Sequence, residues 1–191
     1  MPPDYREEPD VQLMLRVRDG DQDAFARLIE KHQRGILNAA YRYVGDATEA
    51  EDLAQEVFIK VWKARDRYEP TAKFTTWLYH IATNLCLNEV RDRARHKVVM
   101  LVPDEKLEGA AGGDTERPTK QVRQNEMAEE VRDAIESLPS AQRMAVILDK
   151  FQGFTDQEIG DAMGLSVPAV KSLLFRARDN LRKRLEKYVR G

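Results

Sequence analysis

Apolar residues recur at three- and four-residue steps along most of the chain, and no segment shows a sustained alternation of apolar and polar residues. The first period is that of an amphipathic helix, whereas strict alternation would indicate a strand. The pattern therefore predicts an all-α protein. The expected helices cover residues 10–18, 25–44, 52–64, 73–97, 127–138, 140–151, 156–163 and 167–185.

The helical pattern is interrupted between residues 98 and 124. This stretch contains three glycines, two prolines and five acidic residues, so it can bury little apolar surface and is expected to be a flexible linker. It separates two small helical domains. We expect a tail with a short helix over residues 1–20, a first domain over 21–97, the acidic linker over 98–124 and a second domain over 125–191.

Several residues have the type and position of helix caps. Asp10 is predicted to cap the first short helix. Thr48 with Glu51, and Thr155 with Glu158, have the spacing of a capping box, in which each side chain bonds the backbone N–H of the other. The two boxes predict helix starts just after Thr48 and at residue 156.

The stretch from residue 155 to 185 is predicted to form two helices around a tight turn. Gly164 can adopt the left-handed conformation that ends a helix, and Ser166 can cap the next one. Pro168 falls in the first turn of that second helix, where its missing N–H costs little. This pattern is typical of a helix-turn-helix, whose second helix enters the DNA major groove.

Charge is distributed unevenly along the chain. Residues 167–191 hold eight Lys and Arg against two acids, a local charge of 8 − 2 = +6 in a chain of net charge −2. Residues 1–59 hold 7 bases and 13 acids, a local charge of 7 − 13 = −6. Such asymmetry suits a protein that contacts nucleic acid with one face and protein with another. A solvated basic helix in an ordinary bundle is the alternative, but the cap, the glycine turn and the basic helix together favour DNA binding.

Two further surfaces in the first domain are candidates for binding. The helix over residues 52–64 combines acids with large apolar residues, as a protein-docking face does, although Phe58 and Trp62 fit a core equally well. The segment over residues 73–97 begins with aromatic residues beside Lys73 and ends in a cluster of cations. Single-stranded DNA binds such surfaces by stacking bases on rings, although aromatic residues more often fill a core.

Other classes of protein are disfavoured. Apolar runs reach about five residues, against the roughly 20 that span a bilayer, and the acidic N-terminus lacks the apolar centre of a signal peptide. We therefore expect a cytoplasmic protein without membrane insertion. Cys86 has no partner for a disulfide, and His32 has no second metal ligand at helical spacing. No phosphate loop, HExxH or nucleophile elbow is present, so we expect no enzyme activity, metal or cofactor.

Three blocks of sequence, in order, resemble one family. They are DATEAEDLAQEVFIKVWK, KFTTWLYHIATNLCLNEVRDR, and LPSAQRMAVIL followed by GFTDQEIGDAMGLSVPAVKSLLFRAR. The chain resembles the extracytoplasmic-function sigma factors of bacterial RNA polymerase, the compact members of the sigma-70 family with only regions two and four. The resemblance implies a protein that binds core polymerase and directs promoter-specific initiation, typically in a stress or envelope response.

The resemblance also implies three sets of contact residues. The set for the clamp helices of the largest polymerase subunit is Asp52, Gln55, Glu56, Phe58 and Trp62. The set for the melted minus-ten element is Arg67, Tyr68, Thr71, Lys73, Phe74, Trp77, Asn84, Arg91, Arg93 and Arg95. The set for the duplex minus-thirty-five element is Ser166, Pro168, Ala169, Lys171, Ser172, Phe175, Arg176 and Arg178. Within the second set, the loop from Arg67 to Lys73 would capture a flipped-out base, which an α-helix cannot read in full while it stays stacked.

The implied partners are core polymerase, promoter DNA as duplex and as melted strand, and an anti-sigma protein. The sequence departs from the family pattern at three positions. Asn88 stands where many relatives have Asp, and Leu173 where a basic or polar residue is common. Gly160 stands where Ala is usual, which is expected to weaken that short helix by up to about 1 kcal/mol.

Two alternatives predict different behaviour. A helix-turn-helix regulator independent of polymerase would bind its operator alone, as a dimer, at roughly nanomolar concentration. A protein–protein adaptor would tolerate neutralisation of Lys171, Arg176 and Arg178.

Overall fold

The computed structural model describes residues 4–99 and 120–189, with side chains described over 4–91 and 127–186. Every regular element in these residues is a helix, which confirms the all-α prediction. Most of the linker predicted over residues 98–124 lies outside the described residues. The elements are η1 (Tyr5–Glu7), α1 (Pro9–Arg18), α2 (Gln22–Val44), α3 (Ala47–Ala64), η2 (Arg65–Arg67), α4 (Phe74–Val99), α5 (Lys120–Glu136), α6 (Ser140–Phe151), α7 (Asp156–Met163) and α8 (Val167–Val189).

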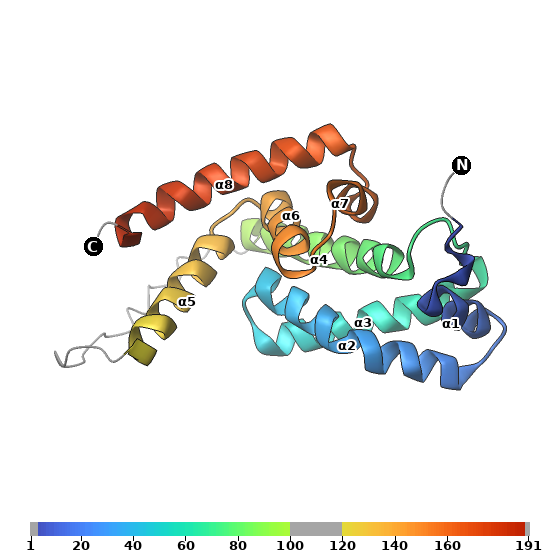
Figure 1. The fold of residues 1–191 in the computed structure, drawn as a ribbon. Helices are drawn as coiled ribbons and strands as arrows, with labels where there is room; N and C mark the ends of the chain where they lie inside the picture. The colour runs from blue at the N-terminus through green and yellow to red at the C-terminus, as the bar shows by residue number, and fades with distance from the viewer. Residues whose placement is uncertain (1–3, 100–119, 190–191) are drawn as a thin grey trace.

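Helices α1 to α4 form the N-terminal bundle (Figure 1). Asp21 begins α2 by accepting a hydrogen bond from Ala24 N at 2.9 Å, and Gly45, with φ of 80°, ends it. The capping box predicted at Thr48 is wrong, because α3 begins at Ala47 and is capped by Asp46. Asp46 follows the Gly45 turn directly, so its carboxylate reaches the free amide N–H groups before Thr48 can.

The predicted cap at Asp10 is also wrong, since α1 begins one residue earlier, at Pro9. Asp10 is only 3% exposed, and its carboxylate accepts hydrogen bonds from Lys31 at 2.6 Å and His32 at 2.9 Å. A buried carboxylate costs free energy unless it is paired, so these two hydrogen bonds compensate for its burial. With Val11 and other apolar residues fully buried, α1 is an integral part of the bundle.

The C-terminal unit contains the predicted helix-turn-helix in α7 and α8. Thr155 Oγ1 accepts from Glu158 N while the Glu158 carboxylate accepts from Thr155 N, so the capping box is confirmed. Gly164 adopts the left-handed conformation with φ of 67° and ends α7. Helix α6 packs against both helices, and α5 packs against α8 (Figure 1).

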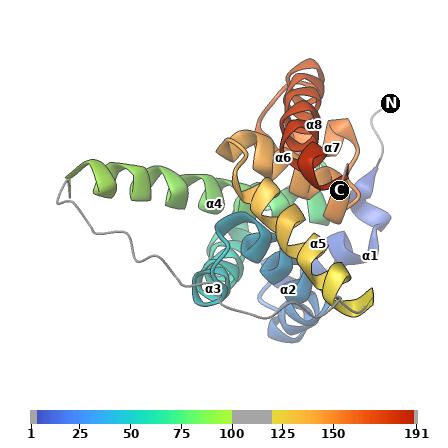
Figure 2. The same ribbon diagram turned by 90° about the vertical axis from the view of Figure 1, so that its left-hand side faces the viewer.

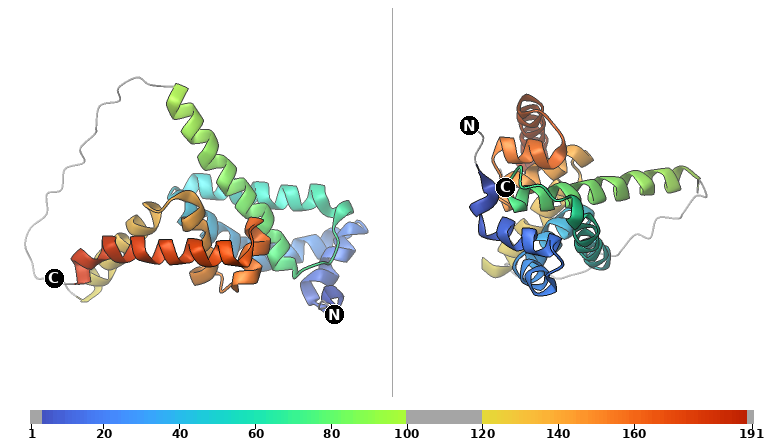
Figure 3. Two further views of the ribbon diagram at one scale, coloured as in Figure 1. Left: turned by 90° about the horizontal axis from the view of Figure 1, so that it is seen from above. Right: turned by 90° about the vertical axis from the view of Figure 1, so that its right-hand side faces the viewer.

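The two units pack directly against each other. Helix α7 lies along α4, and α5 and α6 contact α2, whereas the C-terminal part of α4 extends away from the other helices (Figures 2 and 3). Buried side chains of both units form one continuous hydrophobic core. Polar contacts cross the same boundary: the Tyr79 hydroxyl donates to Gln152 Oε1 at 2.6 Å, and Arg143 Nη1 donates to the Tyr43 carbonyl at 2.6 Å. We refer to this arrangement as the closed state.

Candidate functional site

An open groove runs between α2 and α3, with a volume of about 920 Å³. Its floor is apolar and its rim is polar. The apolar lining side chains are Phe25, Ile29, Leu37, Ala54, Phe58, Ile59 and Trp62. The polar lining residues include Gln22, Gln33, Arg34, Glu51, Gln55 and Lys63. An apolar centre with a polar rim is the composition of a protein-docking surface.

Three of the five residues predicted to dock polymerase line this groove. Phe58 is 8% exposed, so it belongs mainly to the core and offers one edge to the groove. Trp62 packs against Phe25 with ring centroids 5.0 Å apart. Gln55 is exposed at the rim. Phe58 and Trp62 thus contribute both to the core and to the groove, which is why the sequence pattern fitted a core and a docking face equally well.

The remaining members of this set are acidic. Asp52 is exposed on α3, and Glu56 forms an ion pair with Lys60 at 3.6 Å, one helical turn on. Ile59, which is absent from the predicted set, is 45% exposed and lines the groove. Its position one residue after Phe58 in the helical pattern is the signal that could have included it.

The loop between η2 and α4 begins and ends in buried aromatic side chains. Tyr68 is 2% exposed and Phe74 is fully buried. Trp77 completes the cluster, with its ring 4.9 Å from that of Tyr68 and 6.1 Å from that of Phe74. Of these predicted minus-ten residues, Tyr68 and Phe74 therefore support the loop from beneath, while Arg67 and Thr71 are exposed on it.

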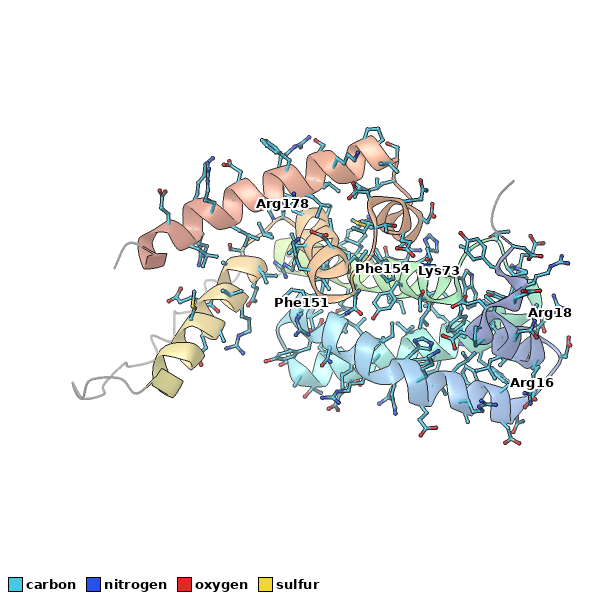
Figure 4. All side chains as sticks on the ribbon, in the orientation of Figure 1. Arg16, Arg18, Lys73, Phe151, Phe154 and Arg178 are labelled. Carbon is cyan, nitrogen blue, oxygen red and sulfur yellow. The ribbon has the colours of Figure 1, made fainter. Side chains whose placement is uncertain are left out.

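Lys73 and Asn84, also in the predicted minus-ten set, border the C-terminal unit. Lys73 Nζ donates to Glu158 Oε1 of α7 at 2.7 Å (Figure 4). The hydrogen bond with Glu158 raises the pKa of Lys73, which therefore stays charged at neutral pH. The amide of Asn84 contacts His80 Nε2 at 3.0 Å, and His80 Nδ1 donates to the Ala162 carbonyl at 3.1 Å.

The three arginines of the predicted minus-ten set lie toward the end of α4. Arg91 is exposed. Arg93 and Arg95 belong to the α4 backbone, but their side chains lie outside the described residues. Asn88, one of the departures from the family pattern, is exposed on the same helix.

Helix α8 presents an exposed face away from the N-terminal bundle (Figure 1). Phe175 is 74% exposed, an unusual state for a large aromatic side chain. Arg176 is exposed and its Nη2 donates to Ser172 Oγ at 2.9 Å. Arg178 points toward α6, where it pairs with Asp149 at 3.4 Å (Figure 4). The remaining exposed members of the set are Ser166, Pro168 and Lys171, and Ala169 is half-buried.

Gly160 has a structural role beyond that expected from helix propensity. A Cβ atom at this position would lie 2.7 Å from the carbonyl oxygen of Leu165, which lies in the turn between α7 and α8. The Leu165 N–H donates to the Gly160 carbonyl at 2.8 Å. The turn between α7 and α8 closes this tightly only because residue 160 has no side chain.

The described residues form neither a metal-binding cluster nor a membrane-spanning helix. No group of three His, Cys, Asp or Glu side chains is placed to hold a metal ion in the part of the chain that the structure describes. His32 bonds to Asp10 and packs on Phe74. Among the described helices, none combines the length and apolar character needed to cross a bilayer.

Family models match both units. The model described as Sigma-70 region 2 matches residues 28–96, and that described as Sigma-70, region 4 matches residues 128–181, together more than half of the chain. Among solved structures, one of CnrH in complex with the cytosolic domain of CnrY has a TM-score of 0.67 at 24% identity and covers 93% of this chain and 97% of that one. The sigma factor RpoE in complex with the anti-sigma factor NepR, from Bartonella quintana, has a TM-score of 0.65 at 23% identity, covering 85% and 96%. At these identities both show a shared fold.

Curated proteins match over nearly the full length. The chain is 37% identical to the RNA polymerase sigma-H factor of Pseudomonas aeruginosa, over 96% of this chain and 97% of that protein. It is 34% identical to the ECF RNA polymerase sigma factor SigW of Bacillus subtilis, over 92% and 98%. Such identity over the whole length shows common descent, and the two units described above are the two regions of that family. The chain belongs to the extracytoplasmic-function sigma factors of the sigma-70 family, non-catalytic subunits of RNA polymerase that initiate transcription.

Proposed function

We propose that the groove between α2 and α3 is where this sigma factor docks on core polymerase, through the clamp helices of the largest subunit. The observation that carries this proposal is the apolar groove itself, open to solvent and bordered by Gln55, Ile59 and Trp62. Leaving Ile59 exposed costs hydrophobic free energy that a partner would recover by covering it. The acids beside it, Asp52 and Glu56, would face basic residues of the partner.

The loop from Arg67 to Lys73 is proposed to hold the melted minus-ten strand. Arg67, Thr71 and Lys73 are exposed, and a rigid aromatic floor lies beneath them. Exposed cations follow a phosphate backbone, while a base expelled from the stack needs a preformed pocket. Arg91, Arg93 and Arg95 would contact DNA beyond the loop.

Helix α8 is proposed to read the minus-thirty-five duplex from the major groove. Its support is the exposed face formed by Lys171, Ser172, Phe175 and Arg176 near the start of the helix. Side chains at the N-terminal end of a recognition helix are the ones that reach base edges. Ser166, Pro168 and Ala169 would approach the phosphates at the helix start, and Arg178 would contribute mainly through Asp149.

The closed state must open for both elements to be bound. The minus-ten and minus-thirty-five elements are about 25 base pairs apart, or roughly 85 Å of duplex at 3.4 Å per base pair. In the closed state Lys73 and α7 are in direct contact. A tether that lets the two readers separate raises the effective concentration of each once the other is bound. Polymerase binding and DNA binding are therefore expected to favour the open state.

An anti-sigma protein is proposed as the negative regulator, acting in the cytoplasm where polymerase and chromosome are found. In a solved structure RpoE, a protein of this fold, is bound by the anti-sigma factor NepR. An occupant of the α2–α3 groove would exclude polymerase by competing for the same apolar surface. The inducing condition would then act on that complex, as in a stress or envelope response.

The proposal is tested by in vitro transcription with bacterial core polymerase and a library of promoter fragments, with and without the protein. Initiation from a defined subset is expected, and loss of that initiation when Lys171 and Arg176 become Ala would assign α8 to promoter recognition. Tight binding of the protein alone to duplex DNA, with no association with core polymerase, would contradict the proposed surfaces and support a dimeric regulator instead.

A further inference from the structure

The first turn of α4 is capped by a side chain from the opposite end of the domain sequence. Glu8 Oε2 accepts a hydrogen bond from Phe74 N at 3.0 Å, across 66 residues of sequence. The first amide N–H groups of any helix lack partners within the helix. Lys73, which precedes α4, carries only hydrogen-bond donors on its side chain and cannot act as the cap. Glu8 therefore supplies an acceptor that the local sequence does not.

The backbone around Glu8 is fixed on both sides. Glu8 N donates to the Tyr5 carbonyl at 3.0 Å, and the Glu8 carbonyl accepts from Gln12 N at 2.9 Å. Pro9 occupies the first position of α1, where its fixed φ restricts the chain further. The Glu8 side chain makes no cap bond to α1 itself, so its carboxylate is directed across to α4.

A second connection runs from α1 to the same point of α4. Asp10 is bonded to His32, whose ring lies 5.4 Å from that of Phe74. The Phe74 ring in turn lies 6.4 Å from that of Tyr68, at the other end of the loop. The backbone of Phe74 is thus held by Glu8, and its ring packs against His32, which is bonded to Asp10.

We infer that Glu8 is a positioning residue for promoter melting: by holding the first amide of α4, it sets the place at which the loop from Arg67 to Lys73 meets the melted strand. The inference rests on the minus-ten role proposed for that loop. Because Lys73 directly precedes the bonded amide, a shift at Phe74 N moves the Lys73 side chain with it. Glu8 acts through the loop and not by touching DNA.

The test compares four variants in the full chain assembled with core polymerase. Glu8→Ala removes the acceptor, whereas Glu8→Gln keeps an amide oxygen that can still accept from Phe74 N. Glu7→Ala is the matched charge control, since Glu7 is the adjacent exposed acid. Lys73→Ala tests the loop itself. Promoter opening, the melting of the DNA, is followed by 2-aminopurine fluorescence in the minus-ten element. Affinity for core polymerase and thermal unfolding are measured in parallel.

Glu8→Ala is expected to slow promoter opening by at least about tenfold, while its affinity for core polymerase stays within about twofold of that of the wild type. Glu8→Gln should recover most of the rate, and Glu7→Ala should match the wild type. If Glu8→Ala opens promoters at the wild-type rate while Lys73→Ala is slow, the positioning role is wrong and the loop role stands. A loss of opening and polymerase affinity in proportion to the unfolded fraction also overturns the inference, because a cap that only stabilises the fold would act in that way.

A different result would contradict the proposed function itself. If Lys73→Ala and Glu8→Ala both open promoters at the wild-type rate, the loop does not hold the melted strand, and Glu8 has nothing to position. The two failures are therefore distinguishable by the behaviour of Lys73→Ala.

Discussion

Lys73 and Glu158 lie 85 residues apart and form a hydrogen-bonded ion pair, with Nζ 2.7 Å from Oε1. The same carboxylate accepts from Thr155 N and Oγ1 and so caps α7. Burial on its own would raise the pKa of Glu158, but the hydrogen bonds from Lys73 and Thr155 hold it below the usual value. Lys73 cannot bond Glu158 and a DNA phosphate in the same geometry, so closure and minus-ten binding compete for this lysine.

Glu158→Gln isolates the ion pair from the cap, because Gln also completes a capping box. Lys73 is about half exposed, with a side-chain exposure of 53%, so the pair should contribute no more than about 1 kcal/mol to closure. We expect Glu158→Gln to raise the ratio of open to closed molecules by up to about fivefold. Single-molecule FRET between dyes attached at positions 60 and 184 measures this ratio directly.

Lys73→Gln should have a similar effect on closure, and the double variant should add little to either single change. Raising the salt concentration should reduce the difference between wild type and Glu158→Gln, since screening weakens an exposed pair. An unchanged open fraction in Glu158→Gln at low salt would show that apolar contacts alone hold the regions together.

The helix-turn-helix could be predicted because all its signals are local. Thr155, Glu158 and Gly164 act on backbone groups within a few residues, and these interactions form in the same way in any context. At Thr48 the same reasoning failed because two caps competed and Asp46 came first in the chain. Local patterns thus predict that a helix exists more securely than where it begins.

The contacts that complete the candidate site could not be predicted, because they join residues far apart in sequence. Nothing near Glu8 indicates that its carboxylate reaches Phe74, and nothing near Lys73 indicates Glu158. The aromatic residues illustrate a second limit. The sequence pattern left open whether the rings beside Lys73 stack bases or fill a core, and Phe74 proves to be buried, forming the floor of the loop together with Tyr68.

Ile59→Glu should weaken binding to core polymerase by at least about tenfold, or about 1.4 kcal/mol. Ile59 is 45% exposed in the groove, so a charge there disrupts docking while the fold should tolerate it. Phe58→Ala is less informative, because truncating a side chain that is only 8% exposed costs about 3–5 kcal/mol of folding free energy. Fluorescence anisotropy with labelled protein and core polymerase gives the affinity.

Met127→Glu is the matched control for this experiment, since Met127 is 65% exposed on α5, outside the groove. It should bind core polymerase like the wild type. Equal loss of affinity in both variants would indicate a general effect of added negative charge. No loss of affinity in Ile59→Glu would show that core polymerase docks on another surface than this groove.

Gly160→Ala should destabilise the helix-turn-helix by about 1–3 kcal/mol, although Ala is the better helix former. The added methyl would lie 2.7 Å from the Leu165 carbonyl oxygen, a backbone atom that cannot move without opening the turn. Thermal unfolding followed by circular dichroism measures the loss. Asp161→Ala, on the exposed side of the same helix, is the control and should be close to neutral; a Gly160→Ala variant as stable as the wild type would show that the turn can relax.

Burial raises the pKa of Cys86 to about 12, so its thiol stays protonated at physiological pH. At pH 8 we expect reaction with a disulfide reagent to be at least about 100-fold slower in the native protein than in denaturant, because the thiolate is the reactive form. The folded pKa lies above the ordinary value of 9.0, so stability from this group is fully present below about pH 9. It should be lost as pH rises toward 12, and Cys86→Ala should lack that part of the alkaline destabilisation. Rapid native labelling would contradict burial of the thiol.

Arg176 and Arg178 should differ in their effect on minus-thirty-five binding, although both are exposed arginines on α8. Arg178 pairs with Asp149 of α6 at 3.4 Å, whereas Arg176 donates a hydrogen bond to Ser172 on the reading face. Arg176→Ala is therefore expected to lower holoenzyme affinity for minus-thirty-five duplex by about 1–3 kcal/mol if it contacts a base, or to reduce the salt slope by about one if it contacts phosphate. Arg178→Ala should cost less, and Arg184→Ala, farther along the helix, controls for loss of one positive charge. Equal losses in all three variants would mean that α8 contributes general electrostatic attraction rather than a specific reading face.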